Sequence, residues 1–393
     1  MFDRRSFLQR SSAGLLTALA GSNAVFADVE TDNRLVFILL RGGLDGLHAL
    51  PPYADRNYQR LRPTLALSMA DKVVDIDGYF GLHPALAPLK PLYTAGELLF
   101  VPAAATRYRS RLHFEGQNLL ENGSGTPYGA RDGWLNRAIQ GFGGEDRRFG
   151  LALGPTVPLI LKGDAEIQTW DMMEPTPPGA DFLYRLGQMY QSDPLFRDAL
   201  QETQGEFKPS PDRLELPNSP TQSENFDLAA QATAELLARH DGPRIAVMEL
   251  QGWDTHYDQA RRLHTPLAQL AQGILTLKDG LGQRVWRKTT VVVVSEFGRT
   301  VAENETQGTD HGTGGLLIMA GGAVRGGRIV GKWPGLGEQD LFEGRSLTPE
   351  NDCESMFKSV LIYHLDLDRH FVENKVFPNS SGMLPHRGLL HSS

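Results

Sequence analysis

The chain has almost no cysteine, no excess of basic residues and no long apolar run. A single cysteine among 393 residues, Cys353, cannot form an intramolecular disulfide, so a disulfide scaffold is excluded. Lys and Arg total 39 against 47 Asp and Glu, and this net charge of −8 offers no basic surface to a nucleic-acid backbone. No stretch is long and charge-free enough to cross a bilayer, which takes about 20 apolar residues. We therefore expect neither a nucleic-acid partner nor a stable membrane span.

The composition is that of a folded globular protein. Hydrophobic residues make up 40% and charged residues 22% of the chain, which excludes the disordered and collagen-like classes. The length permits two or three domains at about 150 residues each, but one decorated α/β sheet also reaches this size. We expect a single domain over residues 28–393, with a flexible insertion near residues 204–223, where prolines and small polar residues gather.

The N-terminus has the pattern of an export signal. Arg4 and Arg5 precede a modest apolar run at residues 13–20, and the segment Gly-Ser-Asn-Ala-Val-Phe-Ala follows at residues 21–27. Paired arginines with Phe and Leu shortly after them match the twin-arginine signal, whose substrates cross the membrane already folded. We therefore expect residues 1–27 to be a signal peptide that engages the twin-arginine export machinery and directs the protein to the periplasm or out of the cell. The alternative is an N-terminal amphipathic segment.

Short aliphatic runs alternate with helical patterns along the chain. The runs expected to be buried strands are residues 35–40, 98–101, 158–161, 244–250, 289–294 and 316–320. The helices expected between them are residues 84–95, 111–121, 223–240, 257–279 and 352–364. Alternating strands and helices favour a mostly parallel sheet that is covered on both faces. The expected fold class is therefore α/β, a three-layer α/β/α sandwich.

Carboxylates and imidazoles gather directly after several of these strands. In an open parallel sheet, ligands bind beyond the carboxyl ends of the strands, so these positions are candidates for a site. Carboxylate and neutral imidazole together suit divalent ions such as zinc, manganese or calcium, and two adjacent sets suit two ions. The candidate metal ligands are Asp45, Asp254, His256, Glu296, Asp310 and His311. We expect one or two divalent metal ions among them.

Each candidate ligand also has a purely structural interpretation. Asp254 could cap the helix that follows it, because Asp is a favoured cap. Glu296 could form an ion pair with Arg299, and the adjacent Asp310 and His311 could belong to a loop turn. The interpretation as a metal site rests on their common position at strand exits along one edge.

A histidine that follows two arginines forms a second group of candidates. His113 comes shortly after Arg109 and Arg111, two side chains able to hold an anionic ligand. The residues alone leave His113 open between a ligand contact and a structural role.

Six motifs give the chain a resemblance to a known family. They are RGGLDGL at 41–47, LHPAL at 82–86, RLHFEGQ at 111–117, GWDTH at 252–256, SEFGRT at 295–300 and TDHG at 309–312. Together with the N-terminal signal, they resemble an exported bacterial family catalogued as domain of unknown function 1501, over nearly the whole chain. That family in turn resembles the alkaline phosphatase and sulfatase superfamily, which implies an alkaline phosphatase-like α/β/α fold with metal ligands at strand exits.

The resemblance also implies roles for the candidate ligands. Asp45 matches the metal-binding aspartate after the first strand, and Asp254 with His256 match the middle pair of ligands. The late Asp-His pair of the superfamily corresponds to residues 310–311, although Glu296 competes for the same correspondence.

The hydroxyl nucleophile of the superfamily has no direct counterpart here. The family pattern places a serine where this chain has Leu112. Ser110 lies two residues earlier, so the nucleophile is displaced to that serine, replaced by water, or lost in an inactive member. In an active protein, Arg109 or Arg111 would hold the anionic oxygens and His113 would assist proton transfer.

Two functions from different classes follow from these residues. The first is an exported metal-dependent hydrolase of phosphate or sulfate esters, in which metal ions polarise the ester and lower the pKa of a bound water or hydroxyl group. The second is a non-catalytic exported binding or assembly protein that retains the fold and a structural metal. Leu112 favours the second function, and the acidic and histidine positions favour the first.

Overall fold

The computed structural model describes residues 31–142, 149–154, 156–170 and 222–391. Within these residues a nine-stranded sheet has the order β10-β4-β9-β8-β1-β7-β5-β6, with β13 paired to β4. β9 runs antiparallel to β4 and β8, and the other pairs of this sheet are parallel. Its strands are β1 Arg34–Arg41, β4 Leu98–Ala105, β5 Gly150–Leu153, β6 Ile167–Trp170, β7 Ile245–Gln251, β8 Thr289–Ser295, β9 Gly315–Ala320, β10 Arg328–Ile329 and β13 Asn351–Asp352.

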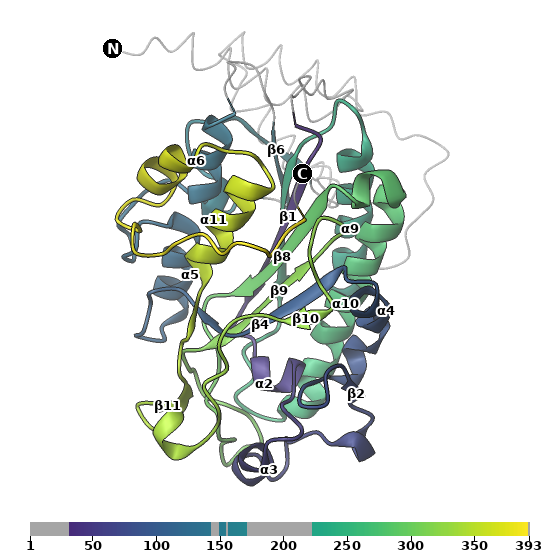
Figure 1. Cartoon of the computed structure of the whole chain (residues 1–393), viewed down its shortest axis with the longest axis vertical. Coiled ribbons are helices and arrows are strands. Elements are labelled where there is room, and N and C mark those ends of the chain that lie inside the picture. The colour runs from purple at the N-terminus through teal and green to yellow at the C-terminus, as the bar shows by residue number, and fades with distance from the viewer. Residues whose placement is uncertain (1–30, 143–148, 155, 171–221, 392–393) are drawn as a thin grey trace, which may run out of the picture.

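Helices cover both faces of this sheet, as Figure 1 shows. One face carries α4 Lys90–Thr94, α9 Gln222–Ala238 and α10 Gln259–Trp286; the other carries α5 His113–Asn122, α6 Trp134–Gln140 and α11 Cys353–Tyr363. Side chains of β1 alternate between the two cores: Ile38 packs in the cluster that contains α9 and α10, and Phe37 in the cluster that contains α6 and α11. The structure therefore confirms the expected class, a three-layer α/β/α sandwich around a mostly parallel sheet.

The central strands end level with one another. β1 lies between β7 and β8, parallel to both, and Leu40 pairs with Leu250 on one side and Ser295 on the other. The aliphatic side chains of these strands are buried on both faces, which explains their near-continuous hydrophobic sequence. The chain consequently leaves all three strands at the same edge of the sheet.

Shorter elements complete the described chain. They are α2 Gly46–Ala49, α3 Arg56–Leu61, η1 Met69–Asp71, β2 Val74–Asp75, β3 Gly81–Leu82, η2 Pro84–Leu89, η3 Leu159–Leu161, η4 Glu338–Asp340, β11 Leu341–Phe342, β12 Ser346–Leu347, α12 Arg369–Phe371 and η5 Val372–Val376. The helix expected at residues 84–95 is thus a 3-10 helix, η2, followed by α4. The helix expected at residues 257–279 starts two residues later and continues to Trp286.

The prediction of a strand at residues 158–161 is wrong. This segment forms the 3-10 helix η3, whose Ile160 and Leu161 are fully buried within the core on the side of α6 and α11. Its apolar character therefore reflects burial in a helix layer, and a run of four residues is too short to separate the two cases by periodicity. Strands β5 and β6, four residues each, form the edge of the sheet beyond β7. They were not predicted from the sequence.

Two expectations fall partly or wholly beyond the described residues. The expected signal peptide, residues 1–27, and residues 204–221 of the expected insertion both lie outside them. Of the helices that the structure describes, none is long and apolar enough to span a bilayer.

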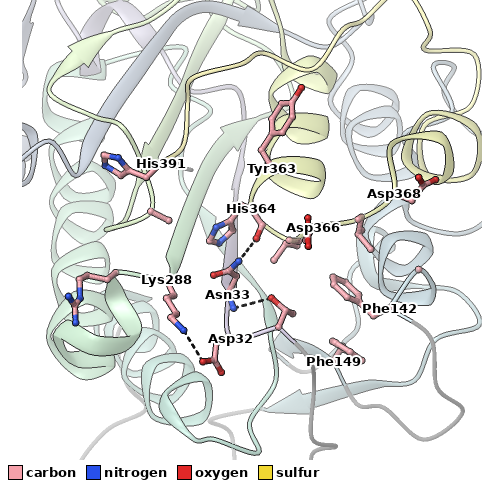
Figure 2. Close-up of a pocket in the computed structure, with 16 residues that line it drawn as sticks. Asp32, Asn33, Phe142, Phe149, Lys288, Tyr363, His364, Asp366, Asp368 and His391 are labelled. Atoms are coloured by element: carbon pink, nitrogen blue, oxygen red, sulfur yellow. Dashed lines mark hydrogen bonds and ion pairs between the residues drawn. The ribbon is translucent and has the colours of Figure 1, made fainter. Parts of the chain in front are cut away.

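A cavity of about 740 Å³ opens at the edge where β1 and β8 begin. Asp32 and Asn33 reach it from just before β1, and Lys288 from just before β8 (Figure 2). Lys288 Nζ lies 2.8 Å from an Asp32 carboxylate oxygen, and the Asn33 side chain donates to the carbonyl oxygen of His364. This cavity lies at the opposite end of the central strands from the loops that follow them.

Three histidines are buried in the core and hold low pKa values. Burial lowers the pKa of His48 to about 4 and that of His364 to about 4. Burial, with the nearby His48 and His264, lowers the pKa of His83 to about 3. His83 Nδ1 accepts a hydrogen bond from the Ala85 backbone at the start of η2, so this residue caps the helix.

We predict that these histidines make the protein sensitive to mild acid. Between the folded pKa values near 3–4 and the unfolded value near 6.5, the unfolded chain binds protons that the folded chain does not, so stability falls as the pH is lowered through this window. Each histidine contributes about 1.4 kcal/mol per pH unit to that slope. His364→Gln retains a donor to Arg34 and should remove about one proton from the slope of unfolding free energy against pH. The same change at His240, an exposed position, is the control; equal slopes in both variants would contradict the prediction.

Candidate metal centre

The loops that follow β1, β7 and β8 meet at the carboxyl edge of the sheet. Gly42, the first residue after β1, has a φ of +126°, and a Cβ there would lie 2.6 Å from the backbone nitrogen of Asp254. Only glycine permits this conformation together with so close an approach. The loop that carries His311 is held opposite the β8 exit by an antiparallel bridge between Arg299 and His311.

The buried guanidinium of Arg299 joins these loops. Its nitrogens donate to the carbonyl oxygens of Gly43 at 2.7 Å, Gly42 at 2.5 Å and Thr309 at 3.0 Å. The same side chain donates to Asp254 Oδ1 at 2.5 Å. A planar group with five N–H donors thus fixes two backbone segments and one carboxylate at the same time.

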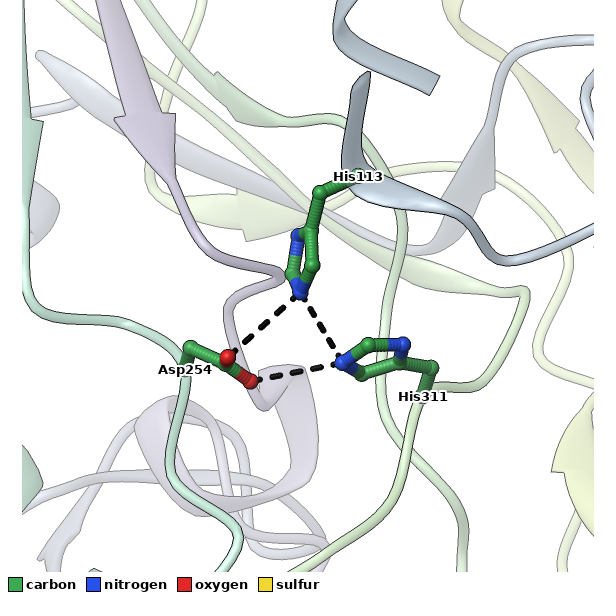
Figure 3. A group of neighbouring side chains, drawn as sticks. All are labelled: His113, Asp254 and His311. Atoms are coloured by element: carbon green, nitrogen blue, oxygen red, sulfur yellow. Dashed lines mark hydrogen bonds and ion pairs between the residues drawn. The ribbon is translucent and has the colours of Figure 1, made fainter. Parts of the chain in front are cut away.

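Three imidazoles and the Asp254 carboxylate converge at this point. His311 Nε2 lies 2.9 Å from His113 Nε2 and 3.0 Å from His256 Nε2. The Asp254 carboxylate lies 3.0 Å from His256 Nε2, 3.3 Å from His311 Nε2 and 3.6 Å from His113 Nε2. Figure 3 shows His113, Asp254 and His311 pointing toward one another, with one possible ligand atom from each within 4.8 Å of the others.

Hydrogen bonds behind two of the imidazoles determine which nitrogen faces the centre. His113 Nδ1 lies 2.7 Å from Glu296 Oε1, and His311 Nδ1 lies 3.0 Å from the carbonyl oxygen of Arg111. Both partners accept hydrogen bonds, so each Nδ1 carries the proton and each Nε2 turns a lone pair to the centre. Glu296 therefore contacts His113 on the side of the ring that faces away from the cluster, as carboxylates commonly do at protein metal sites, and lies outside the group of converging atoms.

Asp310 lies near the Nδ1 atom of His256, on the side of the ring that faces away from the cluster. Its Oδ1 is 3.5 Å from His256 Nδ1, while its other oxygen is 3.8 Å from Arg345. The side chains of His256 and Asp310 are about half exposed, so this pair forms the open side of the centre. The structure therefore places Asp310 beside His256 at the exposed side of the cluster, outside the group of converging atoms that was expected to contain it.

The converging groups fit a divalent cation. Two imidazole lone pairs facing each other at 2.9 Å repel unless a proton or a cation lies between them. Tetrahedral coordination with bonds of about 2.0–2.1 Å separates ligand atoms by about 3.3 Å. The two imidazole nitrogens are 2.9 Å apart; that of His311 lies 3.3 Å from one oxygen of Asp254 and that of His113 lies 3.6 Å from the other, which is close to that value.

Electrostatics keep the carboxylates ionised and His311 available as a ligand. Burial opposes the ionisation of Asp254, but the hydrogen bond and charge of Arg299 outweigh it and lower the carboxyl pKa. Burial is likewise outweighed at Glu296, whose pKa is lowered by hydrogen bonds from His113 and Gln117. Burial and the Arg299 charge lower the pKa of His311, which favours the neutral, ligating form.

Asp45 takes no part in this cluster, which corrects the sequence-based expectation. The carboxylate is 1% exposed and accepts hydrogen bonds from Arg62 at 2.6 and 3.1 Å and from Gln259 at 2.5 Å. Burial raises the pKa of Asp45, but the Arg62 charge and hydrogen bonds outweigh burial and lower it overall. Asp45 also accepts from the backbone of Leu47 as the N-cap of α2, so the structure uses this residue to anchor the loop after β1.

The four residues expected to act in catalysis are separated by the fold. His113 lies in the cluster with Asp254 and His311, whereas Arg109 is turned away, with its guanidinium donating to the carbonyl oxygens of Thr106 and Tyr108. Arg111 forms an ion pair with Glu343, an exposed partner. Ser110 is exposed and hydrogen-bonds to Tyr108.

The structure also decides between the open interpretations. Asp254 caps no helix, because α10 begins at Gln259 with Asp258 at its N-cap position. Arg299 pairs with Asp254 rather than with Glu296.

Sequence analysis did not single out Gln117, whose side chain donates to Glu296 at 3.0 Å. The signal was present, since residues 113 and 117 are four apart and lie on the same face of a helix.

We predict that Glu296→Gln weakens metal binding by about 10- to 100-fold, because the carboxylate that orients His113 is lost. Competition of the purified protein with a zinc indicator measures this directly. Glu249→Gln makes the same chemical change in β7, where the glutamate pairs with Arg41, and should leave the affinity unchanged. Equal affinities for the two variants would show that Glu296 has no role in holding the ion.

Comparison with solved structures found chains to which this one is similar at low sequence identity. A structure of Ps i-CgsB in complex with k-i-k-neocarrahexaose aligns over 91% of this chain and 78% of its own, with a TM-score of 0.44 and 9% identity. The lipoteichoic acid synthase LtaP from Listeria monocytogenes aligns over 79% of this chain and 70% of its own, with a TM-score of 0.35 and 10% identity. A mutant of TAB5 alkaline phosphatase with bound magnesium aligns over 73% and 90%, with a TM-score of 0.34 and 12% identity. No curated protein matches the chain in sequence.

A family model gives a direct assignment. The model described as protein of unknown function, DUF1501, matches residues 105–376, which is more than half of the chain. This stretch contains His113, Asp254, His256 and His311, so the whole candidate centre falls within the matched region. The family expected from the six motifs is thereby confirmed, and the chain belongs to the DUF1501 family.

Proposed function

We propose that the protein is an exported metal-dependent hydrolase of phosphate or sulfate esters. The observation that carries this proposal is the convergence of three imidazole Nε2 atoms and the Asp254 carboxylate at an open edge of the sheet. A structural ion needs a closed set of ligands, whereas a catalytic ion needs an open position. The exposed side of the centre, next to His256, provides that opening.

His113, Asp254 and His311 would hold the ion. An imidazole-rich donor set suits zinc or manganese better than calcium, which takes oxygen ligands. A bound ion of this kind supplies Lewis acidity, which polarises an ester oxygen and lowers the pKa of water. Glu296 and the carbonyl oxygen of Arg111 keep the two histidines in the ligating tautomer.

Arg111 is the residue best placed to hold an anionic oxygen of the substrate. Its Nη1 is buried and, among the described residues, has no hydrogen-bond partner. Its backbone, at a φ of +64°, brings its carbonyl oxygen to His311 immediately before the chain reaches His113. Arg111 thus connects two ligands and retains an unused donor, a combination that Arg109 lacks.

Water is the attacking group in this proposal. Leu112 has no hydroxyl, and Ser295 Oγ is held between the carbonyl oxygen of Leu40 and Glu296. His256 would accept the proton of the water at Nε2, with Asp310 behind its Nδ1 to orient the ring. Ser110 remains on the exposed loop beside Tyr108 and takes no part.

The alternative function, a non-catalytic exported binding or assembly protein with a structural metal, rests on Leu112. This side chain is 56% exposed at the N-cap position of α5, where it supplies neither a cap nor a nucleophile. Metal content alone does not separate the two functions, because both retain an ion. Hydrolysis of an ester separates them.

We predict that the purified mature protein binds a divalent metal and hydrolyses aryl phosphate or aryl sulfate slowly. His311→Ala and Asp254→Ala should lose both properties, because each removes an inner ligand. Metal at about a hundred times its dissociation constant should add roughly 2.7 kcal/mol to the free energy of unfolding, so a chelator should lower the melting temperature. Elemental analysis, thermal unfolding and release of nitrophenol measure these effects.

Controls for this experiment test the attacking group. Ser110→Ala should leave hydrolysis unchanged. Loss of hydrolysis in this variant would identify Ser110, in place of water, as the nucleophile. A protein without metal, and without a change in melting on chelation, would end the hydrolase proposal. A metal-loaded protein without hydrolysis would support the binding function.

Export rests on the paired Arg4 and Arg5. We predict that changing both to Lys retains the precursor inside the cell, because Lys keeps the charge but lacks the guanidinium geometry. Fractionation and the size of the mature chain measure the result. Normal amounts of processed protein in the periplasm would contradict the twin-arginine route.

A further inference from the structure

Several exposed large apolar side chains belong to residues that are next in the chain to the histidines of the candidate centre. Among the described residues, the exposed large hydrophobic side chains are Met69, Leu112, Phe114, Tyr128, Leu228, Tyr257 and Leu384. Three of them are chain neighbours of the centre: Leu112 and Phe114 flank His113, and Tyr257 follows His256. We call Leu112, Phe114 and Tyr257 the apolar rim.

The rim leaves much apolar surface in water. Phe114 is 83% exposed, Leu112 56% and Tyr257 55%. Scattered exposed apolar residues are ordinary on a protein, but several beside one polar centre mark a binding site. A ligand that covers them gains the hydrophobic free energy that the folded chain by itself leaves unused.

The rim is attached to well-fixed backbone. The Leu112 amide donates to the Tyr108 hydroxyl at 3.0 Å, and Phe114 is the second residue of α5. The Tyr257 ring lies 4.3 Å from the guanidinium of Arg262, which backs it with a cation–π contact. The Leu112 backbone and the Tyr257 ring are therefore held in place before a ligand arrives, which lowers the entropy lost on binding.

The polar cluster and the apolar rim thus suit different parts of a ligand. The inner cluster and the free N–H of Arg111 suit an anion, and the rim suits an apolar face. We propose that the substrate is an anionic ester whose other half carries a ring that packs against the apolar rim; this inference rests on the proposed function. Phe114 and Tyr257 determine specificity by contacting that ring, while Arg111 and the ion that the centre would hold bind the charged end.

A ring fits the rim better than a flexible alkyl chain does. Two of the three side chains are aromatic, and aromatic faces pack well on flat groups. An aryl ring and the apolar face of a sugar ring share this chemistry, so the test includes both. A flexible chain would lose more conformational freedom for the same buried area.

Binding of phosphonates, which the enzyme cannot hydrolyse, tests the inference without an activity assay. Isothermal titration of the metal-loaded mature protein would compare methylphosphonate, butylphosphonate, phenylphosphonate and a monosaccharide methylenephosphonate. At least one of the two ring compounds should bind roughly three- to tenfold more tightly than methylphosphonate, and more tightly than butylphosphonate. A preference for phenyl identifies an aryl ester, and a preference for the sugar compound identifies a saccharide ester.

Variants assign the preference to the rim. Phe114→Ala and Tyr257→Ala should each reduce the ratio of ring compound to methylphosphonate affinity about threefold, with methylphosphonate affinity unchanged. Leu384→Ala removes an equally exposed apolar side chain that is not a chain neighbour of the centre, and should leave the ratio as it is.

The outcomes separate this inference from the proposed function. Equal affinity for ring, butyl and methyl compounds, or a ratio unchanged in both rim variants, overturns the rim as a ring site while anion binding and hydrolysis stand. A butyl preference equal to the ring preference shows a general apolar contact and also overturns it. Failure of every phosphonate to bind metal-loaded protein overturns both proposals.

Discussion

The buried Arg299 guanidinium is the interaction on which the carboxyl edge of the sheet depends. It ties the loop after β1, through Gly42 and Gly43, to the loop that carries Thr309, and it holds Asp254 in an ionised and fixed position. A buried cation requires acceptors for its donors, and here the acceptors come from three separate segments. The buried Arg299 side chain needs hydrogen-bond acceptors. It obtains them from Asp254 and from the loop that carries His311, and this holds both residues in position.

Hydrogen bonds to Glu296 orient the imidazole that enters the cluster from α5. Glu296 is buried beneath His113, and it also accepts from Gln117 and from the backbone of Gly42. The same carboxylate thus connects the β1 exit to α5 and fixes the tautomer of His113. Fold and site are joined here, because the residues that close the loops onto one another also aim the imidazoles.

Much of the fold could be predicted from local patterns, and the errors have physical causes. The runs at residues 35–40, 244–250 and 289–294 became β1, β7 and β8, since long β-branched runs suit strands that are buried on both faces. The short run at residues 158–161 did not, because burial alone makes any four-residue segment apolar and the period cannot be read over such a length. The edge strands β5 and β6 were missed for the same reason of length.

The sequence by itself determined which kinds of groups stand at the strand exits, and therefore that imidazoles and carboxylates meet at one edge. It could not determine that the Asp254 carboxylate joins the imidazole cluster while the Asp45 carboxylate is buried against Arg62. Asp45 is paired with Arg62, a residue 17 positions away whose orientation depends on packing, whereas His113 joins the cluster from the start of α5. Ligand identity depends on distances between segments that are far apart in the chain, and only the tertiary structure sets those distances.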